Sequence, residues 1–285
     1  VALGGGFEIC LACHCRIAAR KDLSTWPHCA SGWAMRPVAL TIAGSDSGGG
    51  AGIQADLKAF SALGVFGTSA ITAITAQNTV GVDAVEVVSA AIVRRQIQSV
   101  AADFTIAAAK TGMLANAEII ATVADTVRQT GITRLVADTV MVSKSGHRLL
   151  AADAETAMRD QLLPLAFIVT PNLPEAEVLT GLRITDLPAM HEAARRLFSL
   201  GAKHVLVKGG HLEGQPAVDL FFDGTSFTEL SADRIETKST HGTGCTLSAA
   251  IVAYLCRGKS PLEACRGAKQ YLTGALKNAE PLGHG

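Results

Sequence analysis

The sequence has no excess of charge of either sign. It contains 25 lysines and arginines and 25 aspartates and glutamates in 285 residues, so its formal net charge is zero. Proteins that bind nucleic acids or anionic membrane surfaces usually carry a basic excess or a basic patch. We therefore expect neither nucleic acid nor a membrane among the partners of this chain.

The sequence also lacks an apolar run long enough to cross a membrane. The longest uncharged run lies between Lys58 and Asp83, and it includes glycines, Gln77, Asn78 and four threonines. A membrane-spanning helix needs about 20 predominantly apolar residues, and this run is too polar for that role. We interpret it as a buried strand that leads into an active-site loop.

The familiar nucleotide-binding fingerprints are absent as well. The loop 44–52 holds five glycines in nine residues, so its backbone can approach a ligand closely. Its spacing fits the dinucleotide-binding pattern poorly, and it lacks the Gly-Lys-Ser/Thr ending of a P-loop. A flexible surface turn is the alternative interpretation. Asp56 follows one helical turn later and could face the same pocket.

The first 34 residues show neither helical nor strand periodicity. They hold both tryptophans and four of the seven cysteines. We interpret residues 1–34 as an unstructured extension and residues 35–285 as one domain. Two alternatives remain for this segment. The stretch Cys10-Leu11-Ala12-Cys13-His14 matches the attachment motif of a c-type haem, and a zinc ion could be bound by Cys10, Cys13, His14 and Cys15. An export signal of the usual order is missing.

The other three cysteines, Cys245, Cys256 and Cys265, are typical of reduced cytosolic thiols, so we expect a cytoplasmic protein.

From Arg36 onward, short apolar runs alternate with helical patterns. This alternation predicts an α/β fold with a mostly parallel sheet, whose ligands bind at the carboxyl ends of the strands. The predicted strands are 38–43, 69–74, 106–110, 134–137, 167–170 and 204–208, with a hairpin at 218–222 and 226–230. The predicted helices are 54–63, 92–103, 116–130, 187–200, 246–256 and 261–277.

Several of the loops after these strands carry groups suited to phosphoryl transfer. Gln77 offers an amide, which can pair with the edge of a heteroaromatic base, although a turn-forming role is the alternative. Asp138 and Glu175 each follow a strand, as the carboxylates around a hydrated Mg²⁺ do. The alternative for Glu175 is a helix N-terminal acid. Lys208 supplies a cation next to two glycines, which suits phosphate neutralisation.

The stretch His241-Gly242-Thr243-Gly244-Cys245 enters a predicted helix. Successive backbone N–H groups in a glycine-constrained turn at a helix N-terminus form an anion-binding nest. The motif therefore predicts a site for a phosphate or its transition state, with a purely structural turn as the alternative. Cys245 is either a chemical group or a small residue that suits the start of a helix.

Taken together, these motifs resemble the hydroxymethylpyrimidine/phosphomethylpyrimidine kinases of thiamine biosynthesis, in the ribokinase-like superfamily. The resemblance covers residues 36–285 and is carried by "LTIAGSD", "GGAGIQADLKAFSALG", "AQNT", "KTGML", "DTVMVSKSG", "TPNLPEAE", "VLVKGGH" and "THGTGCTLSAA". It implies a three-layer α/β/α sandwich with a mostly parallel central sheet, and a homodimer. It also implies an ATP- and Mg²⁺-dependent enzyme. Its substrates would be 4-amino-5-hydroxymethyl-2-methylpyrimidine and then the resulting monophosphate.

The resemblance further implies a role for each matching site residue. The acceptor ring would be bound by Gly44, Asp56, Gln77, Met113 and Val140. ATP would be bound by Lys208, Asn172 and Thr240, and Mg²⁺ by Asp138 and Glu175. The anion hole would be formed by Gly242, Thr243 and Gly244, with Cys245 in the position of the base.

Two alternatives to this function remain: a pyridoxal or pyridoxine kinase of the same superfamily, and a pyrimidine-binding relative without activity. A sugar kinase is less favoured, because those enzymes usually have aspartate where Cys245 stands. Beside a helix N-terminus, Mg-ATP and Lys208, we expect the thiol of Cys245 to have a lowered pKa. It could then be a thiolate for the alcohol acceptor and neutral for the phosphorylated one.

Overall fold

The computed structural model describes residues 36–141, 153–209, 217–235, 237, 241–280 and 283–284. Residues 1–34, with their haem and zinc alternatives, and Thr240 lie outside the described ranges, so the predictions about them stay predictions. The chain divides between Arg36 and Pro37, and the unit Pro37–Gly285 is built around one sheet.

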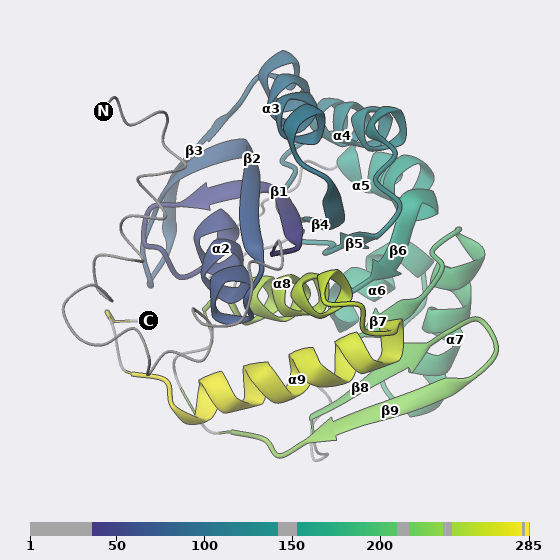
Figure 1. Ribbon diagram of the computed structural model, residues 1–285. Helices are drawn as coiled ribbons and strands as arrows, with labels where there is room; N and C mark the ends of the chain where they lie inside the picture. Colours follow the sequence, from purple (N-terminus) through teal and green to yellow (C-terminus); the bar gives the residue numbers. More distant parts are fainter. Residues whose placement is uncertain are drawn as a thin grey trace, which may run out of the picture. The chain divides into compact units, whose positions relative to one another are not determined.

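The sheet runs in the order β3-β2-β1-β4-β5-β6-β7-β8-β9 within the described residues (Figure 1). From β2 to β7, neighbouring strands are parallel, while β3, β8 and β9 pair antiparallel at the two edges. The strand bounds are β1 Val38–Asp46, β2 Phe66–Gln77, β3 Val82–Val87, β4 Ile106–Thr111, β5 Leu135–Ala137, β6 Ala166–Val169, β7 Val205–Val207, β8 Ala217–Phe222 and β9 Phe227–Ala232.

The helices begin and end at residues with recognisable caps. The side chains of Asn116, Asp186 and Ser260 each accept a hydrogen bond from the backbone three residues on, and Gly131 ends its helix in the left-handed region at φ 69°. The helical bounds are α2 Gly52–Ala62, α3 Ala90–Asp103, α4 Ala117–Thr130, α5 Ala154–Ala157, η2 Met158–Leu162, η3 Leu163–Leu165, α6 Leu173–Thr180, α7 Leu187–Ser199, α8 Thr243–Cys256 and α9 Pro261–Lys277.

No helix in these ranges is both long enough and apolar enough to span a bilayer.

Alternation along the strands separates two hydrophobic cores. In β1, Leu40 and Ile42 belong to one core, and Ala39 belongs to the other, because successive side chains of a strand point to opposite faces. The first core is covered by α3 to α7 and the second by α2, α8 and α9 (Figure 1). The sheet therefore lies between two helical layers, which confirms the predicted α/β/α sandwich.

The structure differs from the predicted elements at several places. β2 covers Phe66–Gln77 rather than 69–74, and α8 begins at Thr243 rather than at residue 246. The edge strand β3 and the helical turns between Ala154 and Leu165 were not predicted. β3 buries none of its residues fully, so it lacks the apolar run by which the parallel strands were identified.

Candidate active site

The polar side chains of the site gather where the parallel strands end. Asp138 follows β5, Lys208 follows β7, and Ser248 lies in the second turn of α8. Nζ of Lys208 donates to Oδ1 of Asp138 at 3.1 Å, and the hydroxyl of Ser248 donates to Oδ2 at 2.9 Å. The carboxylate of Asp138 is thus held by the ammonium group of Lys208 and by the hydroxyl of Ser248, which come from two other parts of the fold.

The charges of Asp138 and Lys208 support each other. Burial by itself would raise the pKa of Asp138, but Lys208 and Lys110 outweigh this effect and lower it. Burial would likewise lower the pKa of Lys208, while Asp138 and Glu175 raise it. Both groups are therefore ionised at neutral pH, and the cation is positioned to meet an anionic ligand.

Glu175 forms part of a capping box at the start of α6. Its Oε2 accepts from the backbone N–H of Asn172 and from the hydroxyl of Thr139, both at 3.0 Å, while the side chain of Asn172 accepts from the N–H of Glu175. The helix-terminal alternative for Glu175 is therefore observed directly. Burial raises the pKa of Glu175, against the opposing effect of Lys208.

Within the described ranges, no group of three or more His, Cys, Asp or Glu side chains could hold a metal ion. Mg²⁺ commonly uses only one or two protein carboxylates and completes its shell with water and substrate phosphates. The two carboxylates near Lys208 fit that limited role: Glu175 keeps Oε1 without a partner among the described residues, and Asp138 is ionised.

The turn before α8 has the geometry of an anion-binding nest. Gly242 is the N-cap with φ 75°, a left-handed conformation that favours glycine, and α8 has no side-chain cap there. The first N–H groups of a helix have no partner within the helix and carry the positive end of its dipole. Gly244 lies against Nζ of Lys208, because a Cβ added to it would stand 3.7 Å from that atom. Gly244 therefore lies beside the cation, and the role of Gly242, Thr243 and Gly244 as an anion hole stays a prediction.

The thiol of Cys245 differs from the expectation. Burial raises its pKa to about 11, Asp56 and Asp138 act in the same direction, and Lys110 opposes them. The helix dipole and a nearby cation do not compensate for the loss of hydration in this structure. Cys245 is therefore a neutral thiol at pH 7, and the expected lowered pKa is wrong for the protein as described.

Asp56 does not present its carboxylate to a pocket. It is fully buried, its Oδ1 accepts from Nζ of Lys110 at 2.8 Å, and its Oδ2 accepts from the hydroxyl of Thr41 at 2.6 Å. This arrangement corrects the expectation that Asp56 reads the edge of the acceptor ring, because both oxygens are already bonded inside the protein. Asp56 instead neutralises a lysine in the middle of the sheet.

The other residues expected around the ring lie at neighbouring strand ends. Gly44 packs against Met113, since a Cβ added to Gly44 would come 3.3 Å from the sulfur of Met113. Gln77 ends β2, and its backbone exchanges hydrogen bonds with the hydroxyl of Ser47 in the glycine-rich loop. Val140 is partly buried just beyond β5. Thr240, expected near ATP, lies outside the described residues.

Sequence reasoning missed Asp46 and His241. The carboxylate of Asp46 accepts N–H bonds from Gly48, Gly50 and Ala51 at 2.8, 3.0 and 2.7 Å, and it accepts from Nε2 of His241 at 3.1 Å. An aspartate just before a glycine run is typical of such a turn, so its local role was visible in the sequence. The contact with His241, 195 residues away, was not.

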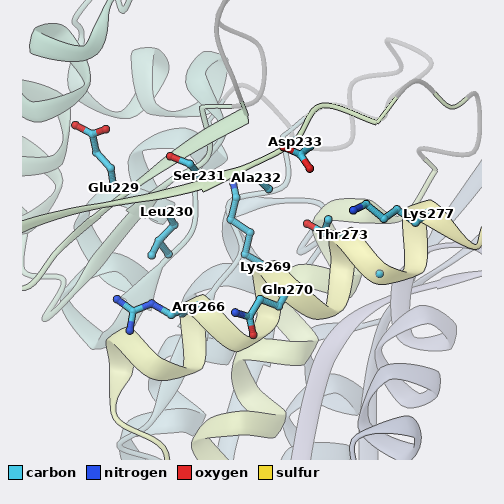
Figure 2. Close-up of a pocket in the computed structure, with 11 residues that line it drawn as sticks. Glu229, Leu230, Ser231, Ala232, Asp233, Arg266, Lys269, Gln270, Thr273 and Lys277 are labelled. Carbon is cyan, nitrogen blue, oxygen red and sulfur yellow. The ribbon is translucent and has the colours of Figure 1, made fainter.

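A hollow lies between β9 and α9 (Figure 2). It has a volume of about 660 Å³ and is bordered by the basic side chains of Arg266, Lys269 and Lys277 on α9 and by the acidic side chains of Glu229 and Asp233. Lys269 donates to Oδ2 of Asp219 at 2.7 Å, while Oδ1 of Asp219 accepts from the N–H of Gly209, next to Lys208. A short chain of bonds therefore links the hollow to the cation of the site.

Comparisons with known proteins show what this chain is similar to. A family model described as phosphomethylpyrimidine kinase matches residues 46–285. A hydroxymethylpyrimidine/phosphomethylpyrimidine kinase of Rhizobium meliloti (strain 1021) is 56% identical over 249 residues, which are 87% of this chain and 93% of that protein. The structure of phosphomethylpyrimidine kinase from Clostridium difficile 630 aligns with a TM-score of 0.76 at 45% identity, over 85% of this chain and 100% of that one. An ADP complex of Bacillus subtilis pyridoxal kinase aligns with a TM-score of 0.81 at 40% identity, over 87% and 94%.

Proposed function

Because this chain belongs to the phosphomethylpyrimidine kinase family, we propose that it is the kinase that phosphorylates 4-amino-5-hydroxymethyl-2-methylpyrimidine and then its monophosphate, in thiamine biosynthesis. ATP is the phosphate donor. The observation that carries the proposal is the meeting of Lys208, Asp138 and the first turn of α8 at the end of the sheet where Gly44 and Met113 also meet. A phosphate-binding half and a ring-binding half thus share one end of the sheet.

The phosphate half acts through charge and position. Lys208 and the N–H groups at the start of α8 bind the transferring phosphoryl group, whose negative charge is spread over its equatorial oxygens in the transition state. Asp138 keeps Lys208 charged and in place. When bound, Mg²⁺ would neutralise phosphate charge, with Asp138 and Glu175 as the carboxylates that hold it, directly or through water.

We place the nucleotide base in the hollow between β9 and α9. The bonds from Lys269 through Asp219 to the N–H of Gly209, which follows Lys208 in sequence, support this position, because they connect the hollow with the cation of the site.

The ring half orients the acceptor alcohol. Gly44, Met113 and Val140 would enclose the ring, and the amide of Gln77 would pair with its polar edge. Asp56 acts indirectly, by holding Lys110 beneath the site. In its minor thiolate form, Cys245 at the start of α8 would accept the proton of the alcohol in the first transfer. A neutral thiol does not repel the dianionic monophosphate in the second transfer.

A pyridoxal kinase is the second candidate, because the Bacillus subtilis pyridoxal kinase is 40% identical to this chain. One experiment separates the two functions. ATP consumption is measured with the pyrimidine alcohol, its monophosphate, pyridoxal and ribose as acceptors under identical conditions. We expect the two pyrimidines to have the highest kcat/KM. Higher kcat/KM for pyridoxal would overturn the proposal in favour of the second candidate.

We also propose a homodimer. Ile74 of β2, Val87 of β3 and Ile92 of α3 are 56%, 38% and 52% exposed, and β3 is one of the two edge strands of the sheet among the described residues. A second copy could cover these apolar side chains and pair with the edge. Ile74→Lys should then shift the mass measured by light scattering toward that of the monomer.

A cytoplasmic location is proposed from the free thiols of Cys245, Cys256 and Cys265.

A further inference from the structure

His241 connects two loops that the proposed function treats separately. It lies in the turn before α8, and its Nε2 is 3.1 Å from Oδ2 of Asp46, the last residue of β1. The side chain of Asp46 is 2% exposed and that of His241 is 20% exposed. Asp46 also binds three N–H groups of the glycine-rich loop, so the histidine ties this loop to the anion-binding turn.

The glycine-rich loop and the turn before α8 pack closely against each other. A Cβ added to Gly242 would collide with the backbone of Gly50, and one added to Gly50 would collide with the ring of His241. The two loops are therefore in direct contact, and the ring is confined between them. Nε2 of His241 has a fixed position relative to both.

The proton on that nitrogen can be assigned from its partner. Burial would raise the pKa of Asp46, but its bonds to Ala51, His241 and Gly48 lower it, so the carboxylate is ionised and can only accept. Nε2 of His241 must therefore carry a hydrogen and donate it. The same atom also lies 3.4 Å from the side-chain amide of Gln77.

This assignment decides the orientation of the Gln77 amide. If its NH₂ group faced His241, two donors would oppose each other. The single hydroxyl hydrogen of Thr75 would also have to serve two acceptors, the carbonyl of Ser45 at 2.9 Å and the amide oxygen at 3.0 Å. Turning the amide by 180° removes the opposed donors and leaves the Thr75 hydroxyl with one acceptor. The single N–H of His241 then points between Oδ2 of Asp46 and the amide oxygen and is shared by them as a three-centre bond, the NH₂ group donates to Thr75, and Thr75 donates to Ser45.

We propose that His241 is a positioning residue that fixes the orientation of the Gln77 amide and thereby makes the enzyme selective for a 4-aminopyrimidine. The inference rests on the proposed function. The oriented amide keeps one N–H and one carbonyl lone pair for a ligand. The aminopyrimidine edge offers an amino N–H beside a ring nitrogen that accepts, which matches this pair in one orientation only. With the amide reversed, donor would face donor and acceptor would face acceptor.

The test compares two acceptors in several variants. The acceptors are the 4-aminopyrimidine alcohol and the same alcohol without its amino group. His241→Phe keeps an aromatic ring but removes the donor, and His241→Gln keeps a donor of similar reach. The matched control is His191→Gln on α7, which lies against Phe227 on the far edge of the sheet. Gln77→Ala removes the amide altogether.

In the wild type, the amino group should raise kcat/KM by about tenfold or more, the range expected when one buried partner is left unpaired. His241→Phe should reduce this preference at least threefold, mainly through KM for the aminopyrimidine, with KM for ATP within twofold of wild type. His241→Gln should restore most of the preference, His191→Gln should leave it unchanged, and Gln77→Ala should abolish it. If the phenylalanine variant does not fold, His241→Ala takes its place.

Equal loss for both acceptors in the histidine variants, or a preference that survives without the donor, would overturn the inference and leave the proposed function intact. If the wild type transfers no phosphate to either pyrimidine alcohol, the proposed function itself is wrong and the inference falls with it.

Discussion

At the scale of single residues, each oxygen of Asp138 is held by a different part of the fold. Lys208 and Thr170 donate to Oδ1, and Ser248 donates to Oδ2. Thr170 and Lys208 each directly follow a strand, and Ser248 lies in α8. The carboxylate therefore has one orientation, and its charge cannot be replaced without disturbing the cation beside it.

Asp138→Asn should lower kcat on the order of a hundredfold, as is typical when one preorganised electrostatic group is removed. It should also weaken the dependence of the rate on Mg²⁺, because the amide carries no charge. A magnesium titration of kcat measures both effects. Ser248→Ala is the control, since it removes one bond and keeps the carboxylate. An unchanged titration in the Asp138 variant would remove this residue from the metal site.

Cys245 offers a direct test of its protonation. Its pKa of about 11 means that the thiol is almost entirely protonated at pH 7, and that the thiolate fraction increases with pH until that value is passed. The rate of alkylation at this residue, followed by peptide mass spectrometry, should therefore rise about tenfold per pH unit between pH 7 and 10. A plateau near pH 8 would instead support the lowered pKa expected from the sequence.

The two phosphoryl transfers should respond differently to substitution of Cys245. Cys245→Ser should slow transfer to the alcohol more than transfer to the monophosphate, because only the alcohol needs a proton acceptor, and the minor thiolate fraction of Cys245 forms more readily than a serine alkoxide. Cys245→Asp should keep part of the first transfer and lose the second, since a carboxylate repels a dianionic acceptor. The two half-reactions are measured separately. Wild-type rates of the second transfer in the aspartate variant would show that repulsion is not the reason for a thiol.

At the scale of elements, a buried ion pair joins α2 to the middle of the sheet. Lys110 in β4 and Asp56 in α2 are both fully buried, with Thr41 of β1 as the third partner. Lys110 is the one charged residue of β4 and needs a counter-charge from another element, because an unpaired buried cation is costly. The pair therefore fixes how α2, and the glycine-rich loop before it, sit on the sheet.

Asp56→Asn should reduce the free energy of unfolding by about 3–5 kcal/mol, because it leaves a buried cation without its partner. Urea denaturation measures the loss, and the double variant Asp56→Leu/Lys110→Met should recover much of it. Asp125→Asn is the matched control, since its pair with Arg128 is exposed and worth about 1 kcal/mol or less. A raised KM for the pyrimidine with an unchanged free energy of unfolding would show instead that Asp56 contacts the edge of the acceptor ring.

At the scale of the whole molecule, the described fold begins with β1. β1 begins at Val38, and both hydrophobic cores are built from residues after it. We expect a chain that begins at Met35 to fold and to be as active as the full chain. Thermal unfolding and kcat/KM of the two chains provide the comparison. A drop of several degrees in Tm, or insoluble protein, would show that residues 1–34 contribute to the folded structure.

The sequence by itself determined the features that depend on local chemistry. Apolar runs that alternate with helical patterns predicted the parallel part of the sheet, and caps such as Asp186 and Gly131 placed helix ends within one or two residues. Short motifs predicted which loops carry the phosphate and ring sites. These features follow from propensity, periodicity and capping, all of which act over a few neighbouring residues.

The tertiary structure decided which groups meet and in what state. Asp56 became a partner of Lys110, burial raised the pKa of Cys245 where a helix N-terminus predicted the reverse, and His241 reached Asp46. Each outcome depends on desolvation or on contacts between segments far apart in the chain. A local sequence pattern cannot predict desolvation or long-range contacts, because both depend on how distant elements pack together.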